Sequence, residues 1–194
     1  MRFDIIYADP AWSYRNKSRK RTVEKHYNTI SLEKMKGFPV NELSKKNSIL
    51  FIWITFPNLE EGLELIKAWG FKYITCAFNW IKKNKSNNKF FMGMGNYTRS
   101  NSELCLIAKK GKGLKRIGKS VKQIICTHRE KHSKKPKETR ERIVELYGNE
   151  VSKIELFARE RDEGWYSLGN ELDGLCLNES ILRMIKGDEI PKID

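Results

Sequence analysis

The sequence predicts one α/β domain whose mostly parallel sheet is covered by helices on both faces. The chain has 194 residues, a length that suits a single domain with a sizeable core. Hydrophobic residues make up 39% of it, which argues against global disorder. Short apolar runs rich in β-branched and aromatic residues alternate with helical patterns, and this order is typical of α/β proteins. We therefore place a single domain over residues 1–194.

Six apolar runs are predicted to be buried strands. They show little strict alternation of polar and apolar residues, which is typical of strands that lie between two layers of helices. Sheets of this kind bind ligands in a crevice at the carboxyl ends of their strands, so a residue directly after a strand is a candidate for a site. The predicted strands are Phe3–Ala8, Ile49–Thr55, Tyr73–Ile81, Leu104–Ala108, Ile124–Cys126 and Lys153–Ala158.

The clearest helix is predicted from Asn58 to Trp69. Asn58 is the expected N-cap, and Glu61, three residues later, fits a capping box. Gly70 supplies the stop signal. The expected apolar stripe of this helix consists of Leu59, Leu63 and Ile66.

Two further helices follow later in the chain. One is predicted after Pro136, because proline is favourable at a first helical position, and Gly148 ends it. The other is shorter and is expected over Glu179–Lys186, before Gly187. The apolar face of the first of these helices consists of Ile143, Leu146 and Tyr147.

The sequence does not support membrane insertion, secretion or a metal site. No apolar run approaches the roughly 20 residues of a membrane-spanning helix. An acid interrupts the short apolar run at the start, which therefore does not resemble a signal peptide. The four cysteines lie far apart without a Cys-x-x-Cys pair, and His128 and His132 have no third ligand nearby. We expect no metal, no membrane contact and a cytoplasmic location.

Positive charge is concentrated in three segments of a chain whose formal net charge is +14. Residues 109–137 hold 12 Lys or Arg and one acid, residues 15–25 hold six and one, and residues 82–99 hold five and none. A single charge run is usually a solvated face, but three runs of one sign favour a polyanion. Aromatic residues beside two of them suit exposed bases. We predict nucleic-acid-binding loops at about 13–30, 82–101 and 109–135, with contacts from Tyr14, Arg15, Lys17, Arg19, Lys110, Lys112, Lys115 and Arg116.

The segment from Ile5 to Trp12 is the most informative for chemistry. A buried strand leads directly into Asp9 and Pro10, and because proline cannot continue the ladder, the chain turns there. One interpretation is a capped strand end with Trp12 folded back on the core. The other is that Asp9 and the Pro10 carbonyl accept hydrogen bonds from an amine while Trp12 stacks on its ring. The exocyclic amine of a flipped base would present this geometry.

These residues resemble a known family. Asp9-Pro10-Ala11-Trp12 is similar to the Asp-Pro-Pro-aromatic motif of methyltransferases that modify amines of adenine or cytosine in nucleic acids. The other blocks resemble the adenine methyltransferase family named for the seventy-kilodalton catalytic subunit of the messenger-RNA enzyme, which has bacterial and phage members that act on DNA. They occur in the family's order over residues 3–175. The blocks are Phe51–Thr55, Ala68–Tyr73, Glu103–Leu106, Ser133–Pro136, Lys153–Arg159, Gly164–Trp165 and Gly169–Gly174.

The resemblance implies a Rossmann-like methyltransferase fold with S-adenosylmethionine as cofactor. The motif order is permuted, with the catalytic strand first and the cofactor strand last. No glycine-rich nucleotide loop is present, since Gly93-Met94-Gly95 is too short. The implied catalytic residues are Asp9, Pro10 and Trp12. The implied cofactor-binding residues are Asp9, Lys135, Glu155, Leu156, Phe157, Arg159, Asn170 and Glu171.

Packing alternatives remain for several of these residues. Glu155 could be an edge-strand acid, Asn170 a turn residue and Lys135 one more solvated lysine. The chain also departs from the family pattern, because Ala11 replaces the second proline and no histidine precedes Glu103.

The sequence thus predicts a methyltransferase for the exocyclic amine of adenine. DNA is the favoured substrate, because the chain is compact and carries no appended RNA-binding module. RNA and the cytosine amine are the alternative substrates. The alternative from another class is a non-catalytic nucleic-acid-binding subunit, and a homodimer or a partner subunit is compatible with either class.

Overall fold

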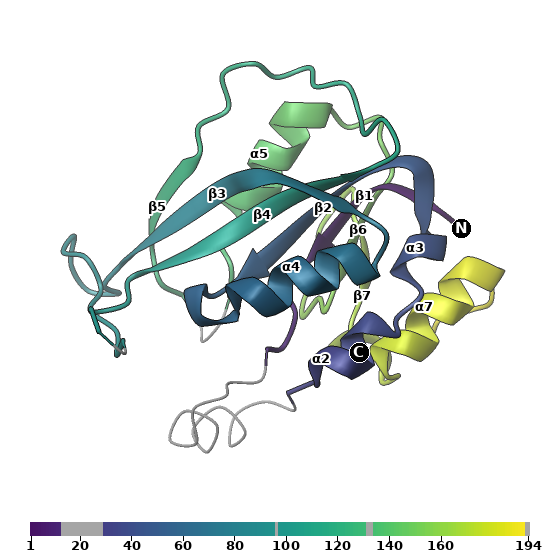
Figure 1. Cartoon of the computed structure of the whole chain (residues 1–194), viewed down its shortest axis with the longest axis horizontal. Coiled ribbons are helices and arrows are strands. Elements are labelled where there is room, and N and C mark those ends of the chain that lie inside the picture. Colours follow the sequence, from purple (N-terminus) through teal and green to yellow (C-terminus); the bar gives the residue numbers. More distant parts are fainter. Residues whose placement is uncertain (13–28, 96, 131–133, 193–194) are drawn as a thin grey trace.

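The computed structural model describes residues 1–12, 29–95, 97–130 and 134–192 (Figure 1). Within these ranges seven strands form one sheet. The strands are β1 (Phe3–Ala8), β2 (Ser44–Ile54), β3 (Lys72–Lys83), β4 (Ser102–Lys110), β5 (Ile124–His128), β6 (Lys153–Leu156) and β7 (Tyr166–Leu168). The helices are α2 (Leu32–Lys36), α3 (Val40–Leu43), α4 (Leu59–Ala68), α5 (Glu138–Tyr147), α6 (Asn170–Asp173) and α7 (Leu177–Lys186), with a 3-10 turn, η1 (Phe56–Asn58), before α4.

The sheet is mostly parallel, as predicted. Its strand order is β5-β3-β4-β2-β1-β6-β7. β1 runs parallel to β2 and β6, β6 is parallel to β7, and β3 is parallel to β5. β4 is antiparallel to both of its neighbours, β2 and β3. The six parallel strands therefore end at one edge of the sheet, which we call the carboxyl rim, and begin at the opposite edge, the amino rim.

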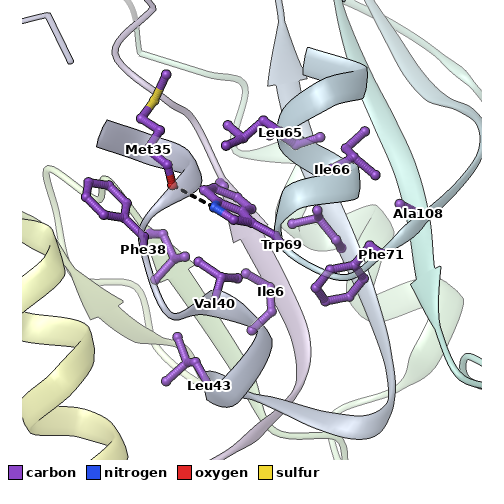
Figure 2. Close-up of a cluster of buried hydrophobic side chains, with 14 of the residues drawn as sticks. Ile6, Met35, Phe38, Val40, Leu43, Leu65, Ile66, Trp69, Phe71 and Ala108 are labelled. Carbon is purple, nitrogen blue, oxygen red and sulfur yellow. Dashed lines mark hydrogen bonds between the residues drawn. The ribbon is translucent and has the colours of Figure 1, made fainter. Parts of the chain in front are cut away.

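Helices cover both faces of the sheet, which confirms that prediction. On one face, α2, α3, α4 and α7 enclose a core with alternate residues of β1 and β2 such as Ile6 and Leu50. Trp69 is fully buried there, and its indole N–H donates to the backbone oxygen of Met35 at 2.9 Å (Figure 2). On the other face, α5 packs Ile143 against the intervening residues of the same strands. Buried on two sides, β1 has no polar alternation in its sequence.

The six predicted strands are present, although several are longer than expected. The strand predicted over Lys153–Ala158 is shorter, because β6 ends at Leu156. Strand β7 and helices α2, α3 and α6 were not predicted. Each of these elements has only three to five residues, which is too short for a periodic pattern.

Helix α4 corrects two details of the prediction. Asn58 stands at the N-cap position but its side chain makes no capping hydrogen bond; its Oδ1 instead accepts from Thr55 Oγ1 at 2.8 Å. The physical reason is that η1 ends at Asn58, so the residue has φ −105° and ψ 20° rather than the extended backbone of a cap. Leu63, predicted in the apolar stripe, is exposed, whereas Leu65 and Ile66 are buried.

The other two predicted helices are confirmed with small shifts. α5 begins at Glu138, just after the N-cap Lys137, and Pro136 lies one residue further out. Gly148 ends this helix with φ 84° and ψ 178°, a positive-φ conformation that glycine adopts without strain. α7 begins two residues earlier than predicted and ends before Gly187, as expected.

Candidate active site

Asp9 lies at the carboxyl rim where three strands end together. The register pairs Ala8 with Ile52 of β2 and with Leu156 of β6, and the Asp9 N–H donates to the Leu156 oxygen at 3.4 Å. Pro10 has no N–H and turns the chain away from the sheet. The turn is closed by the Trp12 N–H, which donates to the Pro10 oxygen at 2.9 Å. A carbonyl oxygen has two lone pairs, so the Pro10 oxygen retains capacity for a second donor.

Four charged side chains alternate in sign from Asp9 along the carboxyl rim. Lys135 Nζ lies 2.7 Å from the Asp9 carboxylate and 3.4 Å from Glu103 Oε2. The other oxygen of Glu103 accepts a hydrogen bond from Lys82. These residues come from the loop after β1, the segment before α5, β4 and β3. The cluster is therefore neutral in sum, and it links the predicted catalytic acid to strands that lie two and three places away in the sheet.

The environment changes the pKa values of this cluster. Burial raises the pKa of Asp9, and Lys135 only partly opposes that rise. For Glu103, burial also favours the neutral form, but Lys135 and Lys82 outweigh it and lower the pKa. Burial opposes the charge of Lys135, yet Asp9 and Glu103 together raise its pKa well above the ordinary lysine value. Lys135 therefore stays protonated at physiological pH and acts as a fixed charge rather than a proton donor.

Trp12 is buried, so its ring is not an exposed surface for stacking. Its side chain is 7% exposed, and its Nε1–H donates to the backbone oxygen of Trp53 at 2.9 Å. Trp53 in turn donates its own Nε1–H to the Tyr7 hydroxyl at 2.6 Å. This placement matches the packing interpretation of Trp12, because a base could stack on the ring only after the ring had moved. Trp12 ties the Asp9 turn to β2.

The Glu155 carboxylate is engaged by an arginine. Arg140 of α5 approaches it with Nε at 2.8 Å and Nη2 at 3.2 Å, and both side chains are buried. Asp162 lies 3.5 Å from the same arginine. Burial raises the pKa of Glu155, and Arg140 opposes the rise. β6 lies between β1 and β7, so Glu155 is not an edge-strand acid. Its ion pair with Arg140 links α5 to the sheet.

The chain turns sharply after β6. Phe157 has φ 63°, a left-handed conformation that is strained for a residue other than glycine and that is concentrated at functional sites. The neighbouring strand comes very close, because the Ala158 N–H donates to the Leu168 oxygen at 3.0 Å. A Cβ on Gly169 would lie 2.0 Å from the Ala158 oxygen, so only glycine fits there.

Three of the predicted cofactor-binding residues are exposed beside this turn. Asn170 and Glu171 open α6 immediately after Gly169, and Arg159 Nε lies 3.7 Å from Glu171. An amide and a carboxylate at this position are suitable partners for hydroxyl groups. The turn follows β6, and β6 is the neighbour of β1 in the sheet. The turn and these polar side chains therefore lie near the end of β1. The residues present fit a nucleoside at the carboxyl rim.

The structure describes only half of the predicted nucleic-acid contacts, and these lie away from Asp9. Tyr14, Arg15, Lys17 and Arg19 lie outside the described residues. Lys110 ends β4, and Lys112 follows it, so both lie at the amino rim rather than beside Asp9. Lys115 and Arg116 precede Ile117, whose N–H donates to the Leu146 oxygen near the end of α5.

The loop between β3 and β4 does reach the carboxyl rim. It begins beyond Lys83 and returns at Ser102, and the Arg129 guanidinium stacks 3.4 Å from the centroid of the Phe91 ring. Phe90 and Tyr97 are exposed on it, together with two methionines. Exposed aromatic and basic groups at this rim suit a single-stranded or flipped base.

No sequence pattern predicted the ion pairs of Glu103, Lys82 or Arg140, although Lys82 lies in a predicted nucleic-acid-binding loop. Glu103 appeared only inside a family block, and Arg140 lies mid-helix with no local signal. Glu103 directly precedes the predicted strand Leu104–Ala108, and an acid there gave no sign of its basic partners. These pairs depend on tertiary contacts between distant elements.

Comparison with known proteins agrees with the motif order. The model of the MT-A70 family matches residues 3–171 of this chain. The chain belongs to the MT-A70 family. Type II methyltransferase M.MunI of Mycoplasma sp. is 32% identical over 190 residues, which cover 88% of this chain and 78% of that protein. Among the described residues, no helix is long and apolar enough to cross a membrane.

MT-A70 proteins of plants and animals are also similar. An N(6)-adenosine-methyltransferase MT-A70-like protein of Arabidopsis thaliana is 30% identical over 195 residues, covering 99% of this chain and 27% of that protein. The N(6)-adenosine-methyltransferase catalytic subunit METTL3 of Homo sapiens is 29% identical over 181 residues, covering 91% and 29%. The chain therefore spans only about a quarter of these longer relatives but most of the length of M.MunI.

Proposed function

We propose that this MT-A70 protein is an S-adenosylmethionine-dependent methyltransferase that acts on the exocyclic amine of adenine in DNA. The observation that carries the proposal is the position of Asp9. It follows the buried strand β1 and lies beside β6, whose strained turn and neighbouring polar residues fit a nucleoside. Family membership supports the reaction type. The similarity to M.MunI over most of both chains favours DNA as the substrate.

We assign S-adenosylmethionine to the carboxyl rim. The cofactor supplies a methyl group activated by a sulfonium centre. The Asn170 and Glu171 side chains would hold its hydroxyl groups, and the Leu156–Phe157 turn would hold its planar base. Arg159 and Lys135 would offset the charge of its carboxylate. Because the Glu155 carboxylate is already bound by Arg140, we give Glu155 a positioning role and no direct contact.

The reacting amine is placed by Asp9 and Pro10. The Asp9 carboxylate and the Pro10 oxygen accept the two N–H bonds of the adenine amine and turn its lone pair toward the methyl group. Positive charge grows on the nitrogen during transfer, and two oxygen acceptors stabilise it without a strong general base. Lys135 keeps Asp9 oriented before the base arrives. Trp12 holds the turn in place through Trp53, so we give it a positioning role in place of stacking.

The base must leave its stack to reach Asp9, which implies base flipping for a duplex substrate. Exposed Phe90 and Tyr97 on the loop between β3 and β4 are among the described aromatic groups that can contact bases near the carboxyl rim. RNA is the second candidate substrate, because several relatives bear the name N(6)-adenosine-methyltransferase.

The test uses isotope-labelled S-adenosylmethionine with duplex DNA, single-stranded DNA and RNA in separate reactions. We expect labelled N(6)-methyldeoxyadenosine from DNA. Asp9→Ala should abolish transfer, whereas Asp188→Asn, at an exposed acid near the end of α7, should leave it unchanged. Thermal melting checks that both variants fold.

Each other result has a definite meaning. Label in RNA adenosine alone would keep the chemistry and replace the substrate. Turnover by Asp9→Ala would refute the proposed role of Asp9. No label in any pool, together with no shift in melting temperature on adding S-adenosylmethionine, would make the chain a nucleic-acid-binding subunit that needs a partner.

A further inference from the structure

Five lysines gather on the amino rim of the sheet, at the edge opposite Asp9. They come from the starts of β2 and β3, the end of β4 and the turn after β4, which are adjacent places in the strand order. In the register, Lys72 of β3 stands directly opposite Lys109 of β4. The five are Lys46, Lys72, Lys109, Lys110 and Lys112.

The backbone holds part of this group rigidly. Gly111 has φ +58°, and a Cβ there would lie 2.4 Å from both the Lys46 oxygen and Asn47 Oδ1. The turn after β4 is therefore in close contact with the start of β2. Asn47 Oδ1 also accepts a hydrogen bond from the Lys112 N–H at 2.9 Å. The lysines of β2 and of this turn are therefore presented from fixed backbone, which lowers the entropy lost when a partner binds.

Lys110 is likewise held by backbone and hydroxyl oxygens. Its Nζ donates to the Asn41 oxygen at 2.6 Å and to Ser44 Oγ at 3.0 Å, and these contacts leave its charge unneutralised. Burial lowers the pKa of Lys110, and the nearby Arg2 lowers it further. Like charges are thus crowded together here.

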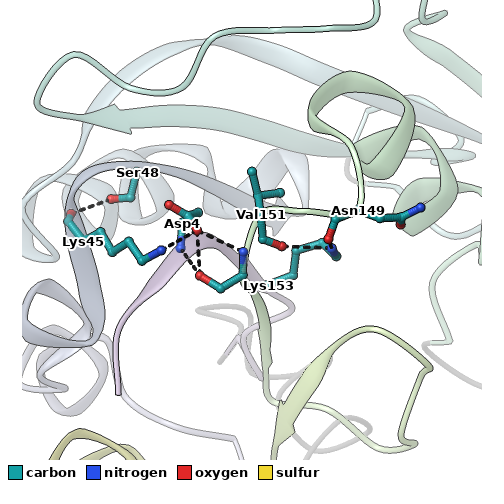
Figure 3. Close-up of polar contacts among 7 residues, drawn as sticks. Asp4, Lys45, Ser48, Asn149, Val151 and Lys153 are labelled. Carbon is teal, nitrogen blue, oxygen red and sulfur yellow. Dashed lines mark hydrogen bonds and ion pairs between the residues drawn. The ribbon is translucent and has the colours of Figure 1, made fainter.

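No carboxylate neutralises the five lysines within the part of the chain that the structure describes. Among the described acids, none forms an ion pair with any of the five. Neighbouring Lys45 differs, because it pairs with Asp4 (Figure 3). At the carboxyl rim, Lys135 and Lys82 are also paired with acids. The five lysines of the amino rim therefore differ from these three ion-paired lysines.

Folding alone gives no reason for this arrangement. Like charges directly opposite each other on neighbouring strands destabilise a sheet, and Lys72 and Lys109 occupy such positions. Lysines without an acidic partner suit the phosphate backbone of a duplex, which carries one negative charge per roughly 1.7 Å of its axis. Bound phosphates would relieve the repulsion between the lysines.

We propose that the amino rim is a second DNA-binding surface, which binds the backbone of duplex DNA away from the methyl-transfer crevice. The proposal rests on the proposed function for its choice of partner. Lys109 and Glu103 lie at opposite ends of β4, about 20 Å apart at roughly 3.4 Å per residue. The two rims therefore contact different stretches of backbone. Two contacts on one long molecule raise the total affinity without a tighter crevice.

The test compares two triple variants with the same change in net charge. The rim variant is Lys46→Gln, Lys72→Gln and Lys112→Gln, at three exposed positions. The control is Lys34→Gln, Lys67→Gln and Lys186→Gln, at exposed positions on α2, α4 and α7. Thermal melting establishes that each variant folds. Binding to a duplex of about three turns, ~30 bp, is then measured against salt concentration.

We expect the salt slope of the rim variant to become shallower by about 0.9 for each phosphate that a lysine no longer neutralises, and thus by up to about 3, with no such change in the control. Methylation of a short single strand, which occupies only the crevice, should be unchanged in both variants. Equal slopes for the rim variant and the control would overturn the proposal. If the rim variant loses binding to vesicles containing anionic lipid but still binds DNA like the wild type, the proposal is also overturned, and the amino rim is a membrane-binding surface instead.

The outcome is separable from the proposed function. If the wild-type protein binds the duplex with a rim-dependent salt slope but methylates no substrate, the second surface stands and the proposed function fails. If the wild-type protein methylates DNA while the rim substitutions change neither slope nor affinity, the proposed function stands and the second surface fails.

Discussion

Arg140→Ala should lower the free energy of unfolding by about 3–5 kcal/mol at pH 7. The substitution leaves the Glu155 carboxylate, whose side chain is 8% exposed, buried without its ion-pair partner. A matched control is Arg183→Ala on α7, which removes an ion pair with Glu179 whose side chains are 38% and 47% exposed. Exposed helical pairs contribute less than about 1 kcal/mol. Both variants remove one positive charge, so the difference between their free energies of unfolding reports the effect of burying the ion pair.

The effect of Arg140→Ala should also depend on pH. Burial already raises the pKa of Glu155 above the 4.5 of an ordinary glutamate, and the loss of Arg140 raises it further. A carboxyl group with a raised folded-state pKa favours folding when protonated and opposes it as the pH rises through that pKa. The stability deficit should therefore be largest at neutral pH and shrink as the pH falls toward 4.5.

Urea unfolding of the wild type and both variants at several pH values measures these quantities. A third variant, Arg140→Met with Glu155→Leu, should recover most of the loss, because an apolar pair leaves no buried charge. If Arg140→Ala costs no more than Arg183→Ala, or if its cost does not shrink in acid, the reasoning about the buried pair is refuted.

Three further changes test other parts of the molecule. Glu103→Gln should slow methyl transfer, and it should make stability fall less on acidification. The pKa of Glu103 is lowered in the folded state, so its ionised carboxylate stabilises the fold above pH 4.5, and this stabilisation is lost as the pH falls through the folded-state pKa. Activity assays and acid-unfolding curves check both effects. Gly169→Ala should cost about 1–3 kcal/mol by melting, because its Cβ would collide with the Ala158 oxygen, whereas Gly37→Ala, with 3.5 Å to its nearest atom, should cost less. Tyr97→Ala should weaken binding to single-stranded DNA by about 1–3 kcal/mol in a titration, and unchanged affinity would remove the residue from the interface.

The sequence predicted the layers of the fold well because burial leaves a local signature. A strand covered on both faces is apolar throughout, so Phe3–Ala8 could be recognised without its neighbours. The three short helices and β7 could not be recognised, because the contacts that stabilise them come from other parts of the chain. The Asn58 cap was wrong for a related reason. A preceding 3-10 turn changed its backbone, and no local pattern predicted that turn.

The position of the site could be predicted from the sequence, but the ion pairs within it could not. The strand-to-proline transition and the family blocks placed Asp9 at the end of a buried strand. They did not show that Lys135 would bridge Asp9 and Glu103, since these three residues are separated by many elements. The buried state of Trp12 was one of two interpretations, and the tertiary hydrogen bond to Trp53 selects it. The placements of Lys110 and Lys112 follow from the antiparallel direction of β4, which no sequence pattern indicated.

The position of β1 between β2 and β6 has a consequence for synthesis of the protein. β2 begins at Ser44, but β6 begins only at Lys153, roughly 100 residues later. At roughly 5–20 residues per second, β1 would wait on the order of 5–20 s after pairing with β2 before its other edge is covered. During that interval a nascent chain exposes an apolar strand edge, which is a risk for aggregation and a natural target for chaperones. The edge of the sheet at which Asp9 meets β6 can form only after this wait, so an interrupted chain has paired β1 with β2 before the proposed site exists.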